Sequence, residues 1–273
     1  MAQLSDDCFA GAERLITTSE ALDILAAQVT PVADEVRVPL RAASGRILAE
    51  DVKSSINVPP HANSAVDGYA VHFSDLHSDQ QTDLPVVGRA AAGRPLGRAA
   101  KRGEAIRIFT GAPMPTGPET VMMQEDCTEQ DGIVTIAPGI KSGANCRSAG
   151  EDVTAGQIVL RRGLRLRPQE IGMAAAVGRT ELQVYQKISV AVFSTGDEVG
   201  EPGTDLSPGK IYDSNRFISI TALERLGCVV EDLGILPDQP EKIGNAIRQA
   251  ATGHDLIVTS GGMSVGEEDH VGK

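Results

Sequence analysis

Aliphatic runs alternate with helix-like segments over the last third of the chain. The run ISVAVFST (188–195) is almost continuously apolar and rich in β-branched residues, which is typical of a strand buried on both faces. Strands are expected at 188–195, 228–236 and 255–260, and helices at 217–226, where Gly227 ends the helix, and at 241–251. The order strand–helix–strand–helix–strand predicts a parallel sheet with right-handed crossovers.

The stretch from residue 51 to residue 151 has a different pattern. Short apolar runs are separated by Gly, Pro and Asp, which is typical of a small all-β unit. Two polar segments, 73–83 and 93–104, are expected to be surface loops, and the basic residues of the second favour a solvated face over a binding patch. The apolar runs are LPVVG (84–88), AIRIF (105–109), TVMMQ (120–124) and GIVTI (132–136).

The segments on either side of this unit combine short helices and strands. After a loose tail, Thr17 and Glu20 have the spacing of a capping box, so a helix is expected from Thr17 to Pro31. Residues 35–52 predict two extended pieces around a turn at Ser44-Gly45. Further elements are expected at 168–177, a helix with Pro168 in its first position, and at ELQVY (181–185), a strand.

Together these changes of pattern predict a multidomain chain of the α/β plus β class. Residues 1–50 and 152–186 are expected to form a discontinuous linker domain, 51–151 a small β domain, and 187–273 an α/β domain with a parallel sheet. The two linker segments are expected to make one elongated body, which holds the β domain away from its own α/β domain.

Composition narrows the class of function. Of the 273 residues 41% are hydrophobic, which is enough for a buried core. The 37 acidic residues outnumber the 25 basic ones, and a net charge of −12 disfavours nucleic acid as a partner. No run approaches the ~20 apolar residues of a membrane helix, and the N-terminus does not resemble a signal peptide. The cysteines form no C-x-x-C pair, so we expect reduced thiols and a cytoplasmic protein. They are Cys8, Cys127, Cys146 and Cys228.

Candidate chemistry gathers where the predicted parallel strands end. In open α/β sheets, ligands bind in the crevice beyond the carboxyl ends of the strands. A Gly-Gly pair follows the third strand, and Ser260 and Ser264 add hydroxyls beside it, as in phosphate sites. The pattern matches neither a dinucleotide fingerprint nor a P-loop, and a Gly-Gly turn alone is more often structural. The residues expected to hold the ligand are Thr195, Gly196, Asp197, Ser260, Gly261, Gly262, Ser264 and Gly266.

Acidic side chains follow the same strands. Asp197, Glu198, Asp238 and Asp269 all fall on strand-end loops, and carboxylates that converge on one crevice would repel each other without a cation between them. Mg²⁺ favours one or two carboxylates together with waters and phosphate oxygens. Any one of these acids, taken alone, is more simply a solvated loop residue or a helix cap, and only their shared position favours a metal–phosphate site.

Six stretches, in order, resemble the molybdopterin molybdenumtransferase family, whose eukaryotic relative is the E domain of gephyrin. Each stretch alone is weak, whereas six in the same order cover nearly the whole chain from about residue 17. They are NSAVDGYA (63–70), RIFTGAPMPTGPETVMMQED (107–126), AGEDVTAGQIVL (149–160), VAVFSTGDEV (190–199), GKIYDSNRF (209–217) and TSGGMSVGEEDHV (259–271).

The resemblance implies an enzyme of molybdenum cofactor synthesis. Such an enzyme binds adenylylated molybdopterin, cleaves its phosphoanhydride with Mg²⁺, releases AMP and places molybdate on the dithiolene sulfurs. It implies a homodimer whose site lies between the α/β domain of one subunit and the β domain of the other. Carried over by motif, the catalytic residues are Asp67, Thr110, Asp152, Glu198, Asp238 and Asp269, the last three also as metal ligands.

The chain departs from the family pattern in two places. Cys146 and Ser148 replace residues that are usually aliphatic and often basic, beside Arg147. The family also continues past Lys273 with the rest of the α/β domain and a C-terminal β domain, so the α/β domain is expected to be incomplete here. A non-catalytic module for dimerisation and pterin binding remains an alternative. An adenylyltransferase shares the α/β loops, but the segments before residue 187 argue against it.

Overall fold

The computed structural model describes residues 16–261 and residue 271. The chain divides into two compact units, one formed by Met1–Asp34 with Gln186–Lys273 and the other by Glu35–Tyr185. The predicted tail before residue 16 and the predicted site residues Gly262, Ser264, Gly266 and Asp269 lie outside the described residues. The three-domain division expected from the sequence stays a prediction.

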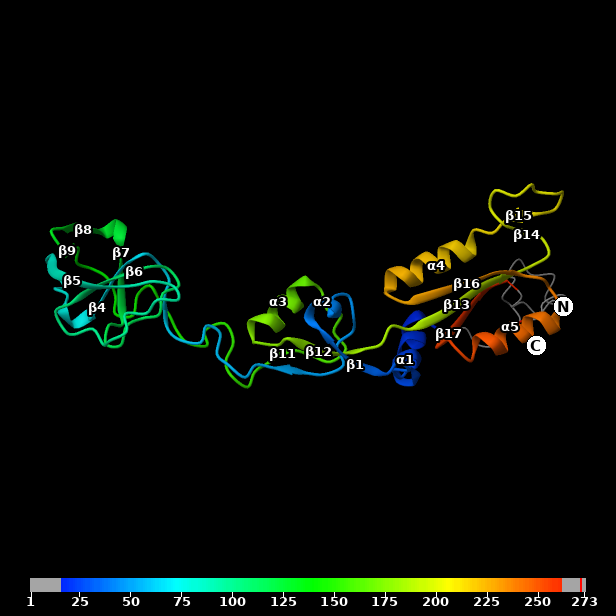
Figure 1. Cartoon of the computed structure of the whole chain (residues 1–273), viewed down its shortest axis with the longest axis horizontal. Helices are drawn as coiled ribbons and strands as arrows, with labels where there is room; N and C mark the ends of the chain where they lie inside the picture. Colours follow the sequence, from blue (N-terminus) through cyan, green and yellow to red (C-terminus); the bar gives the residue numbers. More distant parts are fainter. Residues whose placement is uncertain (1–15, 262–270, 272–273) are drawn as a thin grey trace. The chain divides into compact units, whose positions relative to one another are not determined.

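The first unit contains the predicted parallel sheet. Strand β13 (Ser189–Thr195) lies between β16 (Val229–Leu236) and β17 (Leu256–Ser260), and it pairs in parallel with both. Six of its seven residues are buried, because helices cover both faces of the strand. Helix α4 (Asn215–Leu226) and helix α5 (Pro240–Ala250) lie on opposite sides of the sheet (Figure 1). The predicted strand–helix order is thereby confirmed.

The strand order explains why the two helices lie on opposite faces. From β13 the chain steps to one neighbour, β16, and then crosses back to the other side, to β17. Right-handed crossovers in opposite directions place their helices on opposite faces of the sheet. The direction reverses between β13 and β17, and this switch point is where open α/β sheets bind ligands.

Local sequence sets the ends of helix α4. Gly227 follows its last residue with φ of +95°, a left-handed conformation that glycine adopts without strain. At the other end, the Asp213 carboxylate accepts the backbone N–H of Arg216 at 3.1 Å. This bond starts the helix two residues earlier than the apolar pattern predicts. The loop before it also contains a short parallel pair, β14 (Val199–Gly200) and β15 (Ile211–Tyr212), which the pattern did not predict.

Helix α1 (Thr18–Gln28) begins as predicted and exposes its apolar face. The capping box is formed, since Thr17 accepts the backbone N–H of Glu20 while the Glu20 carboxylate accepts the Thr17 N–H. None of its residues is buried, and Leu22 and Leu25 are 61% and 55% exposed. Like the other helices that the structure describes, it is not long and apolar enough to cross a membrane.

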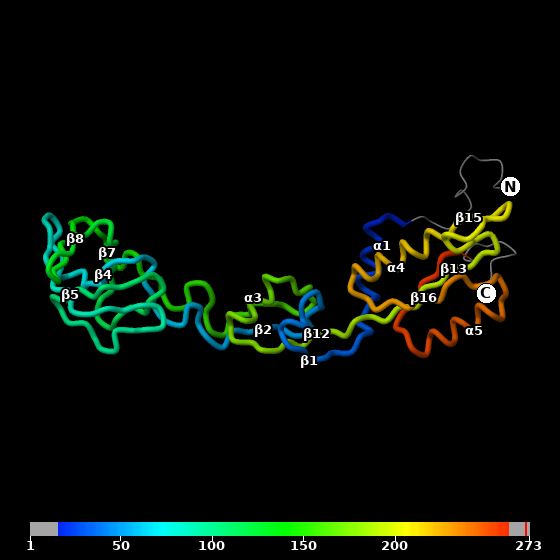
Figure 2. The backbone as a smooth tube through the Cα atoms, turned by 45° about the horizontal axis from the view of Figure 1, so that its top comes forward, coloured from blue at the N-terminus to red at the C-terminus, as the bar shows by residue number. Residues whose placement is uncertain are grey.

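The second unit contains a core built from two segments far apart in the sequence (Figure 2). Leu48, Leu166 and Leu182 are fully buried in it. One expectation fails here, because residues 40–43 form a turn of helix rather than an extended piece. Leu-Arg-Ala-Ala favours helix, and Pro39 suits the position before it. The elements are β1 (Glu35–Pro39) paired with β12 (Glu181–Tyr185), β2 (Val52–Lys53) paired with β11 (Ile158–Leu160), α2 (Leu40–Ala43) and α3 (Pro168–Ala176).

A six-stranded sheet forms the rest of this unit, and it contains all four predicted apolar runs. Its order is β7-β4-β6-β5-β9-β8, with β5 and β6 parallel and the other neighbours antiparallel. The two faces pack separate clusters, one around Val134 and one around Ile106. The strands are β4 (Gly68–Val71), β5 (Thr82–Ala90), β6 (Ala105–Ile108), β7 (Thr120–Met123), β8 (Cys127–Gln130) and β9 (Ile133–Ile136), with β3 (Asn63–Ser64) paired to β10 (Cys146–Arg147) beside them.

Candidate functional site

A pocket lies at the switch point of the parallel sheet. The ends of β13 and β17 form its floor, where Ser194 and Ser260 are register partners on the two strands. This is the crevice that the strand order predicts for a ligand. The residues that line this switch-point pocket are Ser194, Thr195, Glu198, Val199, Ile211, Tyr212, Asp213, Ser214, Asn215, Ser260 and Gly261.

Glycine permits the close approach of the loops at this pocket. A Cβ on Gly261 would lie 2.5 Å from the Thr195 carbonyl oxygen, and its φ is +93°. A Cβ on Gly196 would lie 2.7 Å from a Glu198 carboxylate oxygen. At Gly261 the backbone leaves no room for a side chain, and at Gly196, where the Glu198 side chain could move aside, the φ of +140° is what favours glycine. The predicted glycines therefore bring backbone and carboxylate together at the strand ends.

The predicted acids are placed unequally. Glu198 lines the switch-point pocket, whereas its exposed neighbour Asp197 is not among the lining residues. Asp238 follows β16 and accepts a hydrogen bond of 3.5 Å from the Thr195 hydroxyl. In the part of the chain that the structure describes, no three His, Cys, Asp or Glu side chains gather closely enough to hold a metal. Glu198 therefore lies in the pocket, whereas Asp238 is linked to it only through Thr195.

A charge network centred on the buried Arg216 was missed by the sequence analysis. The Arg216 guanidinium, on a side chain 3% exposed, holds Asp213 at 2.9 Å, Asp232 at 2.5 Å and Glu201 at 2.6 Å. Asp213 itself lines the pocket and is 4% exposed. Asp-Ser-Asn before a helix is a start signal that could have pointed to Asp213. Nothing in local spacing could have supplied its distant partners.

The network keeps its charges. Burial raises the pKa of Asp213, but hydrogen bonds from Arg216 outweigh this and the net pKa is lowered. Burial likewise works against a charged Arg216, yet hydrogen bonds to the three carboxylates raise its pKa overall. Because one cation faces three carboxylates, this wall of the pocket is fixed and acidic.

In the second unit, two predicted residues form one hydrogen-bonded pair. Asp67 Oδ1 accepts both the backbone N–H and the hydroxyl of Thr110, each at 2.7 Å. The hydrogen bond from the Thr110 backbone lowers the pKa of Asp67 most, and the bond from the Thr110 hydroxyl lowers it further. Both bonds go to Oδ1, so Oδ2 of Asp67 makes no hydrogen bond to Thr110. The structure brings these two together although 43 residues separate them.

Asp152 is placed by Arg147. The Arg147 guanidinium binds Asp152 at 2.6 Å and Glu151 at 3.1 Å, and Arg147 itself pairs with Asn63 across strands β10 and β3. Beside it, Cys146 turns inward, with its Sγ 3.2 Å from the Glu119 carbonyl oxygen, and burial raises its pKa. The unusual Cys146 is therefore half-buried against the cluster around Ile106.

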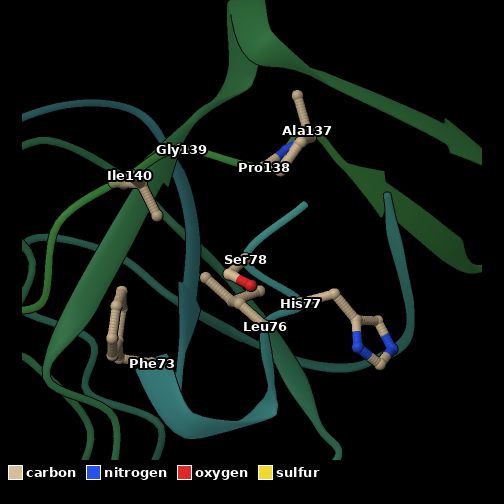
Figure 3. Close-up of a pocket in the computed structure, with 8 residues that line it drawn as sticks. All are labelled: Phe73, Leu76, His77, Ser78, Ala137, Pro138, Gly139 and Ile140. Atoms are coloured by element: carbon tan, nitrogen blue, oxygen red, sulfur yellow. The ribbon is translucent and has the colours of Figure 1, made fainter. Parts of the chain in front are cut away.

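A second hollow in this unit has a different character. Figure 3 shows Phe73, Leu76 and Ile140 standing around it, with the His77 ring at its border. None of the predicted site residues lines it, and its walls carry no carboxylate, Lys or Arg. Its only polar side chains are those of His77 and Ser78.

Comparison with known proteins places the chain in a family. The family model described as "MoeA N-terminal region (domain I and II)" matches residues 16–178, and that of a "probable molybdopterin binding domain" matches residues 191–273. The chain belongs to the MoeA family. Its second match covers the sheet that carries the switch-point pocket, and its first covers the Asp67–Thr110 pair.

Members of the MoeA family match most of this chain. A molybdopterin molybdenumtransferase of Haemophilus influenzae is 45% identical over 84% of the chain, and one of a Nostoc species is 38% identical over 86%. A crystal structure of the molybdopterin biosynthesis MoeA protein of Pyrococcus horikoshii matches with a TM-score of 0.82 at 31% identity, over 91% of this chain and 67% of that one. The chain spans 57% and 54% of the two curated relatives.

Proposed function

We propose that this chain acts in molybdenum cofactor biosynthesis as a molybdopterin molybdenumtransferase. In this reaction, adenylylated molybdopterin is cleaved, AMP is released and molybdate is placed on the pterin dithiolene. The observation that carries the proposal is the switch-point pocket. There Gly261 lets the ends of β13 and β17 come close together, and serine hydroxyls lie in the same pocket as the Glu198 carboxylate. Membership of the MoeA family supports the substrate class.

The residues of the pocket divide the work of binding. The Ser260 hydroxyl and the backbone beside Gly261 are suited to donate hydrogen bonds to phosphate oxygens, while the Thr195 hydroxyl donates to Asp238. Glu198 and Asp238, with Asp269, would hold Mg²⁺ against the phosphoanhydride, where the ion supplies Lewis-acid stabilisation of charge. The Arg216 network keeps Asp213 in place as the opposite wall.

A homodimer completes the proposal. Asp67, Thr110 and Asp152 are proposed to act on the substrate held by the partner subunit, because they belong to a compact unit other than that of the pocket. The exposed apolar face of α1 supports self-association, since Leu22, Leu25 and Val29 are each more than half exposed. We place the reaction in the cytoplasm, where the reduced thiols of this protein are stable.

Calorimetric titration with AMP tests the pocket directly. The wild type is expected to bind AMP more tightly when Mg²⁺ is present. Glu198→Ala should lose this Mg²⁺ dependence, whereas Glu224→Ala, which removes an exposed acid from α4, should keep it. Equal Mg²⁺-dependent affinity in the wild type and Glu198→Ala would remove Glu198 from the site.

A non-catalytic pterin-binding module is the second candidate. The switch-point pocket also favours it, because its glycines and hydroxyls suffice to bind a ligand without turning it over. Both candidates bind AMP, but only the first releases it from adenylylated molybdopterin. Turnover therefore separates them.

A further inference from the structure

Two arginines stand side by side on one face of the six-stranded sheet. Arg89 of β5 and Arg107 of β6 are register partners, and Arg107 is in turn the partner of Tyr69 on β4. Register partners on adjacent strands point to the same face of a sheet. The sheet thus fixes both guanidinium groups over the same surface.

An aromatic ring holds the two guanidinium groups. The Cζ of Arg89 lies 4.6 Å from the centroid of the Phe109 ring, and the Cζ of Arg107 lies 4.9 Å from the same centroid. Arg107 also lies 4.9 Å from the centroid of Tyr69. Cation–π contact uses the flat face of a guanidinium and leaves its N–H edge free to donate elsewhere.

Neither arginine is neutralised by a direct ion pair. Within residues 16–261, no carboxylate oxygen lies within 4 Å of a side-chain nitrogen of Arg89 or Arg107, whereas Arg98 and Arg102, in the segment before β6, each bind one carboxylate. Arg107 donates to the Gly68 carbonyl oxygen at 3.2 Å and to the Gln124 side chain at 2.5 Å, which fixes its position. Arg89 is exposed. Two like charges on one ring repel, and an anion between them would relieve that repulsion.

We propose that Arg89 and Arg107, with Phe109 as their platform, form a binding site for a doubly charged tetrahedral oxyanion. The ligand class is a phosphate group or free molybdate, because oxygen pairs of either match the forked donors of Arg89, and Arg107 adds its charge and its remaining N–H donors. Phe109 immediately precedes Thr110, so the site adjoins the Asp67–Thr110 pair in the chain. This site shares no residue with the switch-point pocket, and oxyanion binding to it can be measured without turnover of a substrate.

Calorimetric titration of the whole chain tests the site, with inorganic phosphate in one arm and molybdate in the other at constant ionic strength. Arg89→Gln carries the test, because Arg89 is exposed and, within residues 16–261, its side chain makes a ring contact with Phe109 but no hydrogen bond or ion pair. The control is Arg161→Gln, which removes the same charge from an exposed arginine elsewhere in this unit. Circular dichroism of each variant checks that it is folded.

The wild type is expected to bind at least one of the two oxyanions saturably. Arg89→Gln should weaken that binding at least tenfold, and Arg161→Gln should leave it within twofold. Binding of phosphate alone identifies a phosphate ester as the ligand class, and binding of molybdate alone identifies the free metal oxyanion. No saturable binding of either, equal affinity in Arg89→Gln, or an equal loss in Arg161→Gln would each overturn the proposal. If Arg89→Gln loses oxyanion binding while its AMP binding is unchanged, the arginine site is distinct from the switch-point pocket of the proposed function.

Discussion

Glycine at position 261 sets how closely two strand ends approach. Its backbone has a φ of +93°, and a side chain there would meet the Thr195 carbonyl oxygen at 2.5 Å. Both the backbone conformation and the space exclude any other residue without strain. The approach in turn shapes the floor of the switch-point pocket.

We predict that Gly261→Ala destabilises the chain by about 1–3 kcal/mol and weakens AMP binding. The reason is that the Thr195 backbone must move away from the new methyl group. Gly253→Ala is the matched control, because no atom lies within 4 Å of its added Cβ and its φ is not positive. Urea unfolding of both variants measures the difference, and equal stability would show that the close approach does not constrain the fold.

A second residue prediction concerns pH. Hydrogen bonds from the Arg167 side chain lower the pKa of Glu170 from 4.5 to about 2, with burial opposing them. A carboxyl whose pKa is depressed on folding stabilises the fold above its unfolded pKa, and loses this contribution as pH falls from 4.5 towards 2. Glu170→Gln should therefore lower the melting temperature at pH 7, and the gap to wild type should narrow at pH 3.

The control for that experiment is Glu181→Gln, an exposed glutamate of β12. Its gap to wild type should stay small at both pH values. A Glu170→Gln gap that widens towards pH 3 would contradict the assigned role of Arg167.

At the level of elements, periodicity predicted what is local. The buried strand β13, helix α3 with its proline start and the capping box of α1 all follow from neighbours within a few residues. The turn of helix at α2 was missed because four residues are too short for a period. The strand ends at which the sequence predicts a site do line a pocket, as topology alone leads one to expect, and the role of that pocket stays a prediction.

Long-range contacts could not be predicted in the same way. Asp232 reaches Arg216 from another element, and only the folded chain brings them together. The same holds for the row of Arg89, Arg107 and Tyr69, which depends on the register of three strands. Sequence spacing contains no information on such registers, so these charges could not be assigned partners beforehand.

Helix α1 provides the prediction at this scale. Leu22→Glu with Leu25→Glu places charges on its exposed apolar face while keeping good helix formers. If this face joins two copies, the double variant should shift from dimer to monomer in analytical ultracentrifugation. Ala27→Glu, on another side of the same helix, should leave the mass unchanged. A wild type that is monomeric at all concentrations, or an unaltered dimer in the double variant, would contradict the proposal.

For the whole molecule, the proposal divides one reaction between two compact units. The pocket residues belong to one unit and the Asp67–Thr110 pair to the other. If each active site combines units from two subunits, then a dimer of two different variants contains one site with both residues intact.

We therefore predict complementation between Asp67→Ala and Glu198→Ala. Each variant alone should release no AMP, and mixing them under conditions that exchange subunits should restore up to about one quarter of the wild-type rate, because half of the dimers are mixed and each has one intact site. A mixture of Asp67→Ala with Thr110→Ala, whose changes lie in the same unit, should restore nothing. Demonstrated subunit exchange without recovery would reject the arrangement across subunits.

The central claim is that this chain cleaves adenylylated molybdopterin at the switch-point pocket. Release of AMP from that substrate, in the presence of molybdate and followed by chromatography, tests it most directly. We predict release that requires Mg²⁺, is abolished in Glu198→Ala and persists in Glu224→Ala. A folded wild type that binds AMP but releases none from adenylylated molybdopterin, or a Glu198→Ala variant that releases it at the wild-type rate, would contradict the account.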